Sequence, residues 1–136
     1  MKRIVWGKSI GFGVGLVGFL SIPYVFPDAS MMLRVGVLVW YTLVGAMVAV
    51  TGVVDRHPLC SFRLTSFIRG AMLGASMNIA LVLIAFETLS TLMQTSVWFA
   101  GMSPFWLVAE GLVVGMIIDV IITKKTGEGA SLCAGQ

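Results

Sequence analysis

The stretch EGLVVGMIIDVII runs from Glu110 to Ile122 and raises the first question about the fold. Eleven of its thirteen residues are apolar or glycine, and the other two, Glu110 and Asp119, are carboxylic acids. A segment of this kind belongs either in the core of a soluble protein or in a membrane. Burying an acid costs a different free energy in each of these environments. The composition of the whole chain has to decide between them.

The composition is that of a membrane protein. The chain has 136 residues, of which 58% are hydrophobic and 11% are charged. An ordinary soluble domain is about 25% charged, and a chain with so few charges could not cover a water-exposed surface. We therefore predict an integral membrane protein in contact with the lipid bilayer. The net charge of +3 gives no reason to expect a nucleic-acid partner.

Four apolar runs are long enough to span a bilayer. They cover roughly residues 4–26, 32–54, 67–93 and 104–123. Each has about 20 residues or more, which as a helix crosses a hydrocarbon core of about 30 Å. Because the core offers no water to the backbone, such segments must be helical. The sequence thus predicts an all-α fold, a single domain of four transmembrane helices in a bundle, with residues 124–136 as a short polar tail.

The basic residues predict the orientation. Eight of the nine fall on the same side as both termini: Lys2, Arg3, Lys8, Arg56, Arg63, Arg69, Lys124 and Lys125. Arg34 falls on the other side. By the positive-inside rule, both termini and the middle loop lie in the cytoplasm. The expected location is a bacterial inner membrane or a plasma membrane.

Glycines recur at four-residue steps in three of the four runs. The set is Gly7, Gly11 and Gly15, then Gly70 and Gly74 followed by Asn78, and finally Gly111 and Gly115. This spacing lines one face of a helix with small residues and lets a second backbone approach closely. We interpret these faces as packing surfaces, within or between chains, with Asn78 as an interhelical hydrogen-bond donor. They also favour a homo-oligomer or a place among other membrane subunits.

Asp119 is expected to be structural. It follows Gly111 and Gly115 at the same spacing, so it shares their face, close to the cytoplasmic end of its helix. Lys8 and Arg69 come out at a comparable depth in their own helices. The sequence therefore predicts an ion pair between Asp119 and either Lys8 or Arg69.

Glu110 is the stronger candidate for function. It lies nine residues from Asp119, on the opposite side of the helix, and about 9 Å into the membrane when counted from Pro104. The same count puts Glu87, Tyr41 and Thr42 in one layer with it. A charge in mid-membrane costs about 2.5–3.5 kcal/mol, and two neighbouring acids without a cation are not expected to be ionised together. Two hypotheses stay open: a proton- or cation-binding layer, or a neutral polar clamp.

No catalytic or metal-binding pattern accompanies these residues. The chain has no nucleophile elbow, no H-E-x-x-H and no phosphate loop, and it has a single histidine. We expect no metal and no cofactor, and an enzyme is the weaker hypothesis. Two functions remain. One is a small oligomeric channel or transporter, linked to protons or cations, that uses intramembrane carboxylates. The other is a structural or accessory membrane subunit without transport activity of its own.

Overall fold

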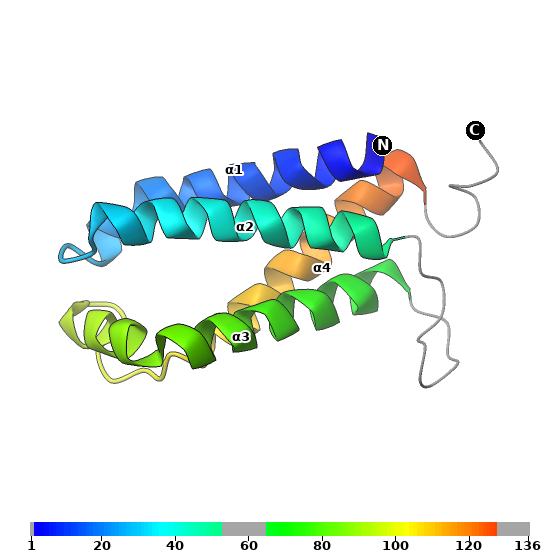
Figure 1. Cartoon of the computed structure of the whole chain (residues 1–136). Helices are drawn as coiled ribbons and strands as arrows, with labels where there is room; N and C mark the ends of the chain where they lie inside the picture. Colours follow the sequence, from blue (N-terminus) through cyan, green and yellow to red (C-terminus); the bar gives the residue numbers. More distant parts are fainter. Residues whose placement is uncertain (1, 53–64, 128–136) are drawn as a thin grey trace.

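A computed structural model of the chain describes residues 2–52 and 65–127. This part of the chain contains four helices, shown in Figure 1: α1 (Lys2–Val25), α2 (Met31–Thr51), α3 (Ser66–Thr95) and α4 (Trp106–Thr126). Each is long and apolar enough to cross a membrane. The predicted all-α fold with four membrane-spanning helices is confirmed. Residues 53–54 of the predicted second span and 128–136 of the predicted tail lie outside the described residues.

Local sequence accounts for where the helices begin and end. Ser30 precedes α2, and its hydroxyl accepts a hydrogen bond from the backbone N–H of Leu33 at 3.2 Å, as a serine N-cap does. Gly127 ends α4 with a positive φ of 77°, a conformation that glycine adopts without steric cost. The expected start of α4 at Pro104 becomes a preceding turn, because the N–H groups of Trp106 and Leu107 bond back to the carbonyls of Ser103 and Pro104.

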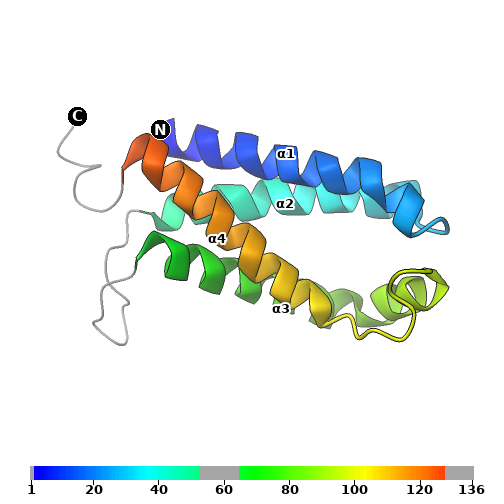
Figure 2. The same ribbon diagram turned by 180° about the vertical axis from the view of Figure 1, so that it is seen from behind.

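The helices form two antiparallel hairpins, α1–α2 and α3–α4. Figures 1 and 2 show α1 lying along α2, while α4 crosses α3. Between the hairpins, α1 meets α4, α2 meets α3, and α2 also meets α4. We call the end that holds the N-terminus and Thr126 the terminal end. The opposite end, with the connections 26–30 and 96–105, is the distal end.

Within the first hairpin, glycines bring the two backbones into contact. A Cβ placed on Gly7 or Gly11 would overlap a carbonyl oxygen of α2, that of Gly45 or Tyr41 respectively. One turn further, a Cβ on Gly15 would come within 2.7 Å of a third α2 carbonyl. This close approach requires glycine on α1, and Gly45 supplies the matching small residue on α2.

The second hairpin repeats this packing. A Cβ on Gly70 would overlap the carbonyl oxygen of Gly115, and one on Gly74 would overlap that of Gly111. A shift of 63 residues carries Gly7 and Gly11 of α1 onto Gly70 and Gly74, and a shift of 70 carries Gly45 of α2 onto Gly115. The chain is thus built from two hairpins with equivalent interfaces. All seven glycines predicted to pack are buried within the chain itself.

The apolar core lies between the hairpins, where α2 faces α4. It consists of Val44, Val48, Ala49, Ile118 and Ile122, all at most 1% exposed. Much of the remaining apolar surface faces outward, as expected for helices surrounded by lipid. Polar side chains inside the bundle are therefore few, and their positions define the candidate site.

Candidate functional site

Asp119 binds two arginines at the terminal end of the bundle. Its carboxylate is fully buried and accepts hydrogen bonds from Arg69 Nε at 2.8 Å and Arg69 Nη2 at 3.1 Å. Arg3 Nη2 donates to the same carboxylate at 2.6 Å, and Arg3 Nε donates to the carbonyl oxygen of Ala49 at 3.0 Å. These contacts tie α1, α2, α3 and α4 together at one point. We call Arg3, Arg69 and Asp119 the arginine clamp.

The clamp differs in one partner from the sequence prediction. Arg69 is one of the two expected partners of Asp119, but the second arginine is Arg3 and not Lys8. Lys8 is exposed on α1. Arg3 lies four residues before Gly7 and shares the buried face of α1 with the glycines. The four-residue spacing therefore contains a signal for Arg3, which enters the sequence prediction only as evidence for the orientation in the membrane.

Asn78 joins three helices deeper in the bundle. Its side chain is 1% exposed. Its Oδ1 accepts a hydrogen bond from Trp40 Nε1 of α2 at 3.1 Å, and its Nδ2 donates to the carbonyl oxygen of Leu107 in α4 at 2.7 Å. Asn78 also lies against Gly111, where a Cβ would come within 2.5 Å of Nδ2. This asparagine holds α4 against α3 on the distal side of the contacts that Gly70 and Gly74 make with α4.

Glu110 and Tyr41 come together, as the sequence predicted for this pair. The Tyr41 hydroxyl donates to Glu110 Oε1 at 2.9 Å. Tyr41 is buried, at 7% exposure, whereas the Glu110 side chain lies exposed on the surface of the chain. Thr42 is half-buried and its hydroxyl donates to the Leu38 carbonyl of its own helix at 2.7 Å. The described polar pair at this depth is therefore Glu110 with Tyr41.

The structure places Glu87 far from this pair. Gly74 packs on Gly111, the neighbour of Glu110, and Glu87 lies thirteen residues further along α3. Thirteen residues are about 20 Å of helix. A non-helical residue at Ala85 also bends α3 just before Glu87. The predicted layer with both acids is therefore split into two separate regions.

The predicted depth of Glu110 in the membrane differs from the observed one because of the path of residues 96–105. The prediction places the start of α4 level with the end of α3. In Figure 1 the connection instead runs back along α3 before α4 starts. Two contacts agree with this path: Leu107 is bonded to Asn78, and the Phe105 ring lies 6.1 Å from the Phe86 ring. As a result, Glu110 lies further from the distal end, and so nearer the middle of the span, than its distance from Pro104 predicts.

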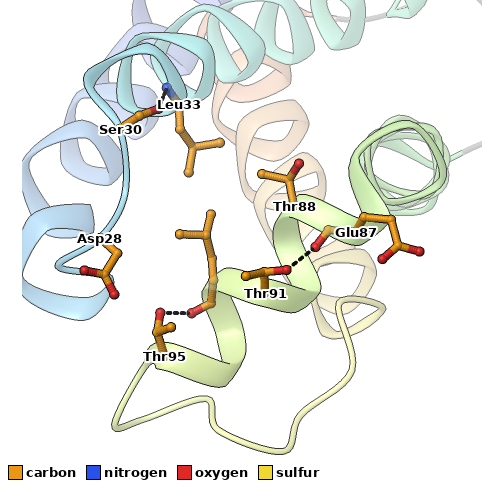
Figure 3. Close-up of a pocket in the computed structure, with 8 residues that line it drawn as sticks. Asp28, Ser30, Leu33, Glu87, Thr88, Thr91 and Thr95 are labelled. Atoms are coloured by element: carbon orange, nitrogen blue, oxygen red, sulfur yellow. Dashed lines mark hydrogen bonds between the residues drawn. The ribbon is translucent and has the colours of Figure 1, made fainter.

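At the distal end, an open cleft of about 500 Å³ separates the start of α2 from the last turns of α3. Figure 3 shows the residues around it. They are Asp28, Ser30, Leu33, Glu87, Thr88, Thr91, Leu92 and Thr95. Beside the cleft the hairpins remain in contact, since Ser96 Oγ donates to the Val25 carbonyl at 2.8 Å and the Phe26 and Phe99 rings stack at 5.6 Å.

Within residues 2–52 and 65–127, no three His, Cys, Asp or Glu side chains lie close enough together to hold a metal ion. In the same part of the chain, every buried side-chain nitrogen and oxygen has a hydrogen-bond partner. The buried polar groups thus join helices to one another.

No protein family, curated protein or solved structure matches the chain. Its function is therefore inferred from the geometry of its polar groups.

Proposed function

We propose that this small four-span membrane protein is a proton- or cation-linked transporter in which Glu110 takes up and releases the ion. One observation carries the proposal. Glu110 is a carboxylic acid in the interior of the span that is held by a neutral hydroxyl, that of Tyr41, and whose side chain is exposed on the bundle surface. Ionisable groups within a span, where they face protein or water, mark ion and proton pathways in membrane proteins.

The comparison with Asp119 shows why Glu110 is the better ion carrier. Asp119 binds two buried guanidinium groups, so protonating it would leave those charges without their counter-ion. Glu110 lies nine residues away, about 13 Å along α4, and its described hydrogen-bond partner is uncharged. A change of charge on Glu110 therefore disturbs one hydrogen bond and leaves the arginine clamp unchanged.

The exposure of Glu110 supports an oligomer in which another chain covers this side chain. Acids within a span almost always face protein or water and avoid lipid. We propose that the face of α4 bearing Glu110 is covered by a second copy of the chain, so that the ion pathway lies between protomers. The glycine faces are already filled by helices of the same chain, and thus self-association would use a different surface.

The proposal keeps the orientation given by the positive-inside rule. Among the described residues, Lys2, Arg3, Lys8, Arg69, Lys124 and Lys125 belong to the terminal end or the turns nearest to it, and Arg34 lies in the first turn of α2 at the distal end. On this basis the terminal end faces the cytoplasm of a bacterial inner membrane or a plasma membrane.

The test is ion flux in vesicles that contain the purified protein. We expect a pH gradient to drive proton or monovalent-cation flux through the unmodified protein, and we expect Glu110→Gln to abolish it. The glutamine carbonyl can still accept the hydrogen bond from Tyr41, so the thermal stability should change little. Glu87→Gln, which removes the same charge in a separate region, should leave the flux intact. Absence of flux in the unmodified protein, or equal flux in Glu110→Gln, would contradict the proposal.

The alternative is a structural or accessory membrane subunit. It is favoured by the complete pairing of buried polar atoms in the described residues and by the dense links at Asp119 and Asn78. In that case Glu110 and Tyr41 form an uncharged hydrogen-bonded pair that packs against a neighbouring subunit. Glu110→Gln and Tyr41→Phe would then change the recovery of the assembly, while vesicles with the unmodified protein would show no gradient-driven flux.

A further inference from the structure

We propose that the distal cleft binds an amphiphile that carries a positively charged amine and an alkyl chain. The cleft begins about 12 Å along α2 from Tyr41, since Leu33 lies eight residues before it, and it shares no lining residue with the Glu110–Tyr41 pair. The proposal therefore stands whether or not Glu110 transports ions.

The cleft has the dimensions of a small-molecule site. Its volume of about 500 Å³ falls within the usual range for ligand pockets, about 300–1,000 Å³. It lies between the two hairpins, with Asp28, Ser30 and Leu33 on one side and α3 residues beyond the bend at Ala85 on the other. In Figure 3, Leu33 and Thr88 project into the space from opposite sides.

The polar part of the lining offers several hydrogen-bond acceptors beside the hydroxyl proton of Ser30, whose oxygen accepts from Leu33 N–H. The hydroxyls of Thr91 and Thr95 donate to the carbonyls of Glu87 and Leu92, each at 2.9 Å. Their protons are thus engaged, and their oxygen lone pairs can accept a further hydrogen bond. Asp28 adds an exposed carboxylate at the rim, and no lysine or arginine lines the cleft. A ligand group that donates hydrogen bonds and carries positive charge matches this lining.

The apolar part of the lining explains the alkyl chain. Leu33 and Leu92 contribute hydrocarbon to the walls, and Leu33 lies one turn further into α2 than Ser30. On the α2 side, Asp28 and Ser30 thus stand at the end of the span and Leu33 further along it, whereas on α3 Leu92 lies nearer the distal end than Thr88 and Thr91. The α2 side has the order of an amphiphile in a bilayer, with the headgroup at the surface and the chain below it.

Glu87 provides a matched control for Asp28. It borders the cleft, but in Figure 3 its carboxylate points away from the space between the hairpins. Neutralising Glu87 changes the net charge by the same amount as neutralising Asp28, at a carboxylate that points away from the cleft.

The test uses the full chain in nanodiscs of phosphatidylcholine, with a fluorescent alkylammonium as the probe. We expect saturable binding that decylammonium displaces and that decanol and decyl sulfate do not. Asp28→Asn should weaken binding about threefold to fivefold, the effect of losing one exposed ion pair. Glu87→Gln should bind as tightly as the unmodified protein. Leu33→Trp should place a bulky ring in the cleft and abolish binding, and Thr91→Phe serves the same purpose if the tryptophan variant does not fold.

Three results would overturn the proposal. The first is equal displacement by decanol, which would show simple partitioning of the chain. The second is an equal loss of affinity in Asp28→Asn and Glu87→Gln, which would show a general charge effect. The third is unchanged binding in a folded variant with the bulky ring in the cleft. Adding phosphatidylethanolamine to the nanodiscs identifies the natural source: competition indicates an aminophospholipid, and its absence indicates a free alkylamine, the site being supported by either.

Discussion

Two acids of α4 that differ by nine positions have opposite environments. Asp119 is fully buried between Arg3 and Arg69, whereas Glu110 is exposed and bonded to the hydroxyl of Tyr41. Nine residues are half a turn out of phase on a helix, so the two carboxyls face different neighbours. Asp119 therefore joins helices through ion pairs, whereas Glu110 is bonded to an uncharged hydroxyl and remains exposed at the surface of the chain.

Neutralising Asp119 should strongly destabilise the protein. Asp119→Asn would leave the buried guanidinium groups of Arg3 and Arg69 without their counter-ion, and breaking a buried ion pair in this way costs about 3–5 kcal/mol. Thermal unfolding in detergent measures the loss. Double mutants with Arg3→Gln and with Arg69→Gln should show coupling, because each arginine contacts the carboxylate. Lys8→Gln should combine additively with Asp119→Asn, and coupling to Lys8 in place of Arg3 would contradict the clamp.

Removing the Tyr41 hydroxyl should have a smaller effect on stability. Tyr41→Phe deletes the hydrogen bond to Glu110 and should cost about 1 kcal/mol. If Glu110 carries protons, the pH dependence of flux should also shift, because the variant alters the group that contacts the carboxyl. Thr42→Val is the control, since the Thr42 hydroxyl bonds within its own helix. An identical shift in both variants would argue against a specific role for Tyr41.

At the scale of helices, much of the packing could be predicted from spacing alone. The four-residue steps identify the buried faces of α1, α3 and α4, because close backbone contact requires small residues at that period. The matching face of α2 was missed, since it holds one glycine, Gly45, with Ala49 one turn on. The position of α4 along α3 could not be predicted either. Run lengths give the size of a span, but they do not reveal that residues 96–105 turn back before Trp106.

The two kinds of glycine on α1 give a direct test of the packing faces. A Cβ on Gly11 would overlap the Tyr41 carbonyl, whereas one on Gly13 would meet nothing within 4 Å. We expect Gly11→Ala to lower the melting temperature by several degrees, because the α1 and α2 backbones must separate. Gly13→Ala should leave it unchanged or raise it, since alanine is the better helix former by up to about 1 kcal/mol. Similar losses for both variants would show that the glycines are not specific contacts.

At the scale of the whole molecule, the chain resembles a dimer of hairpins joined in one polypeptide. Gly45 and Gly115 hold equivalent places in their hairpins, and the next position on that face is Ala49 in one and Asp119 in the other. Both arginines of the clamp converge on Asp119. The polar contacts thus break the equivalence of the halves, and they link the two hairpins beside the apolar core, through Arg3–Asp119 and Trp40–Asn78.

The exposed face of α4 is where a second copy is expected to pack. Trp106, Val113 and Ile117 are 51%, 46% and 47% exposed, and together with Glu110 they follow one side of the helix. With Cys60 and Cys133 replaced by serine, Val113→Cys should form a disulfide-linked dimer in native membranes under mild oxidation. The bond requires Cβ atoms about 3.5–4.5 Å apart, so it reports direct contact. Leu20→Cys, on an exposed position of α1, should remain monomeric. If both variants stay monomeric, Val113 does not meet its counterpart in a second copy, which contradicts an ion pathway at this face between two copies of the chain.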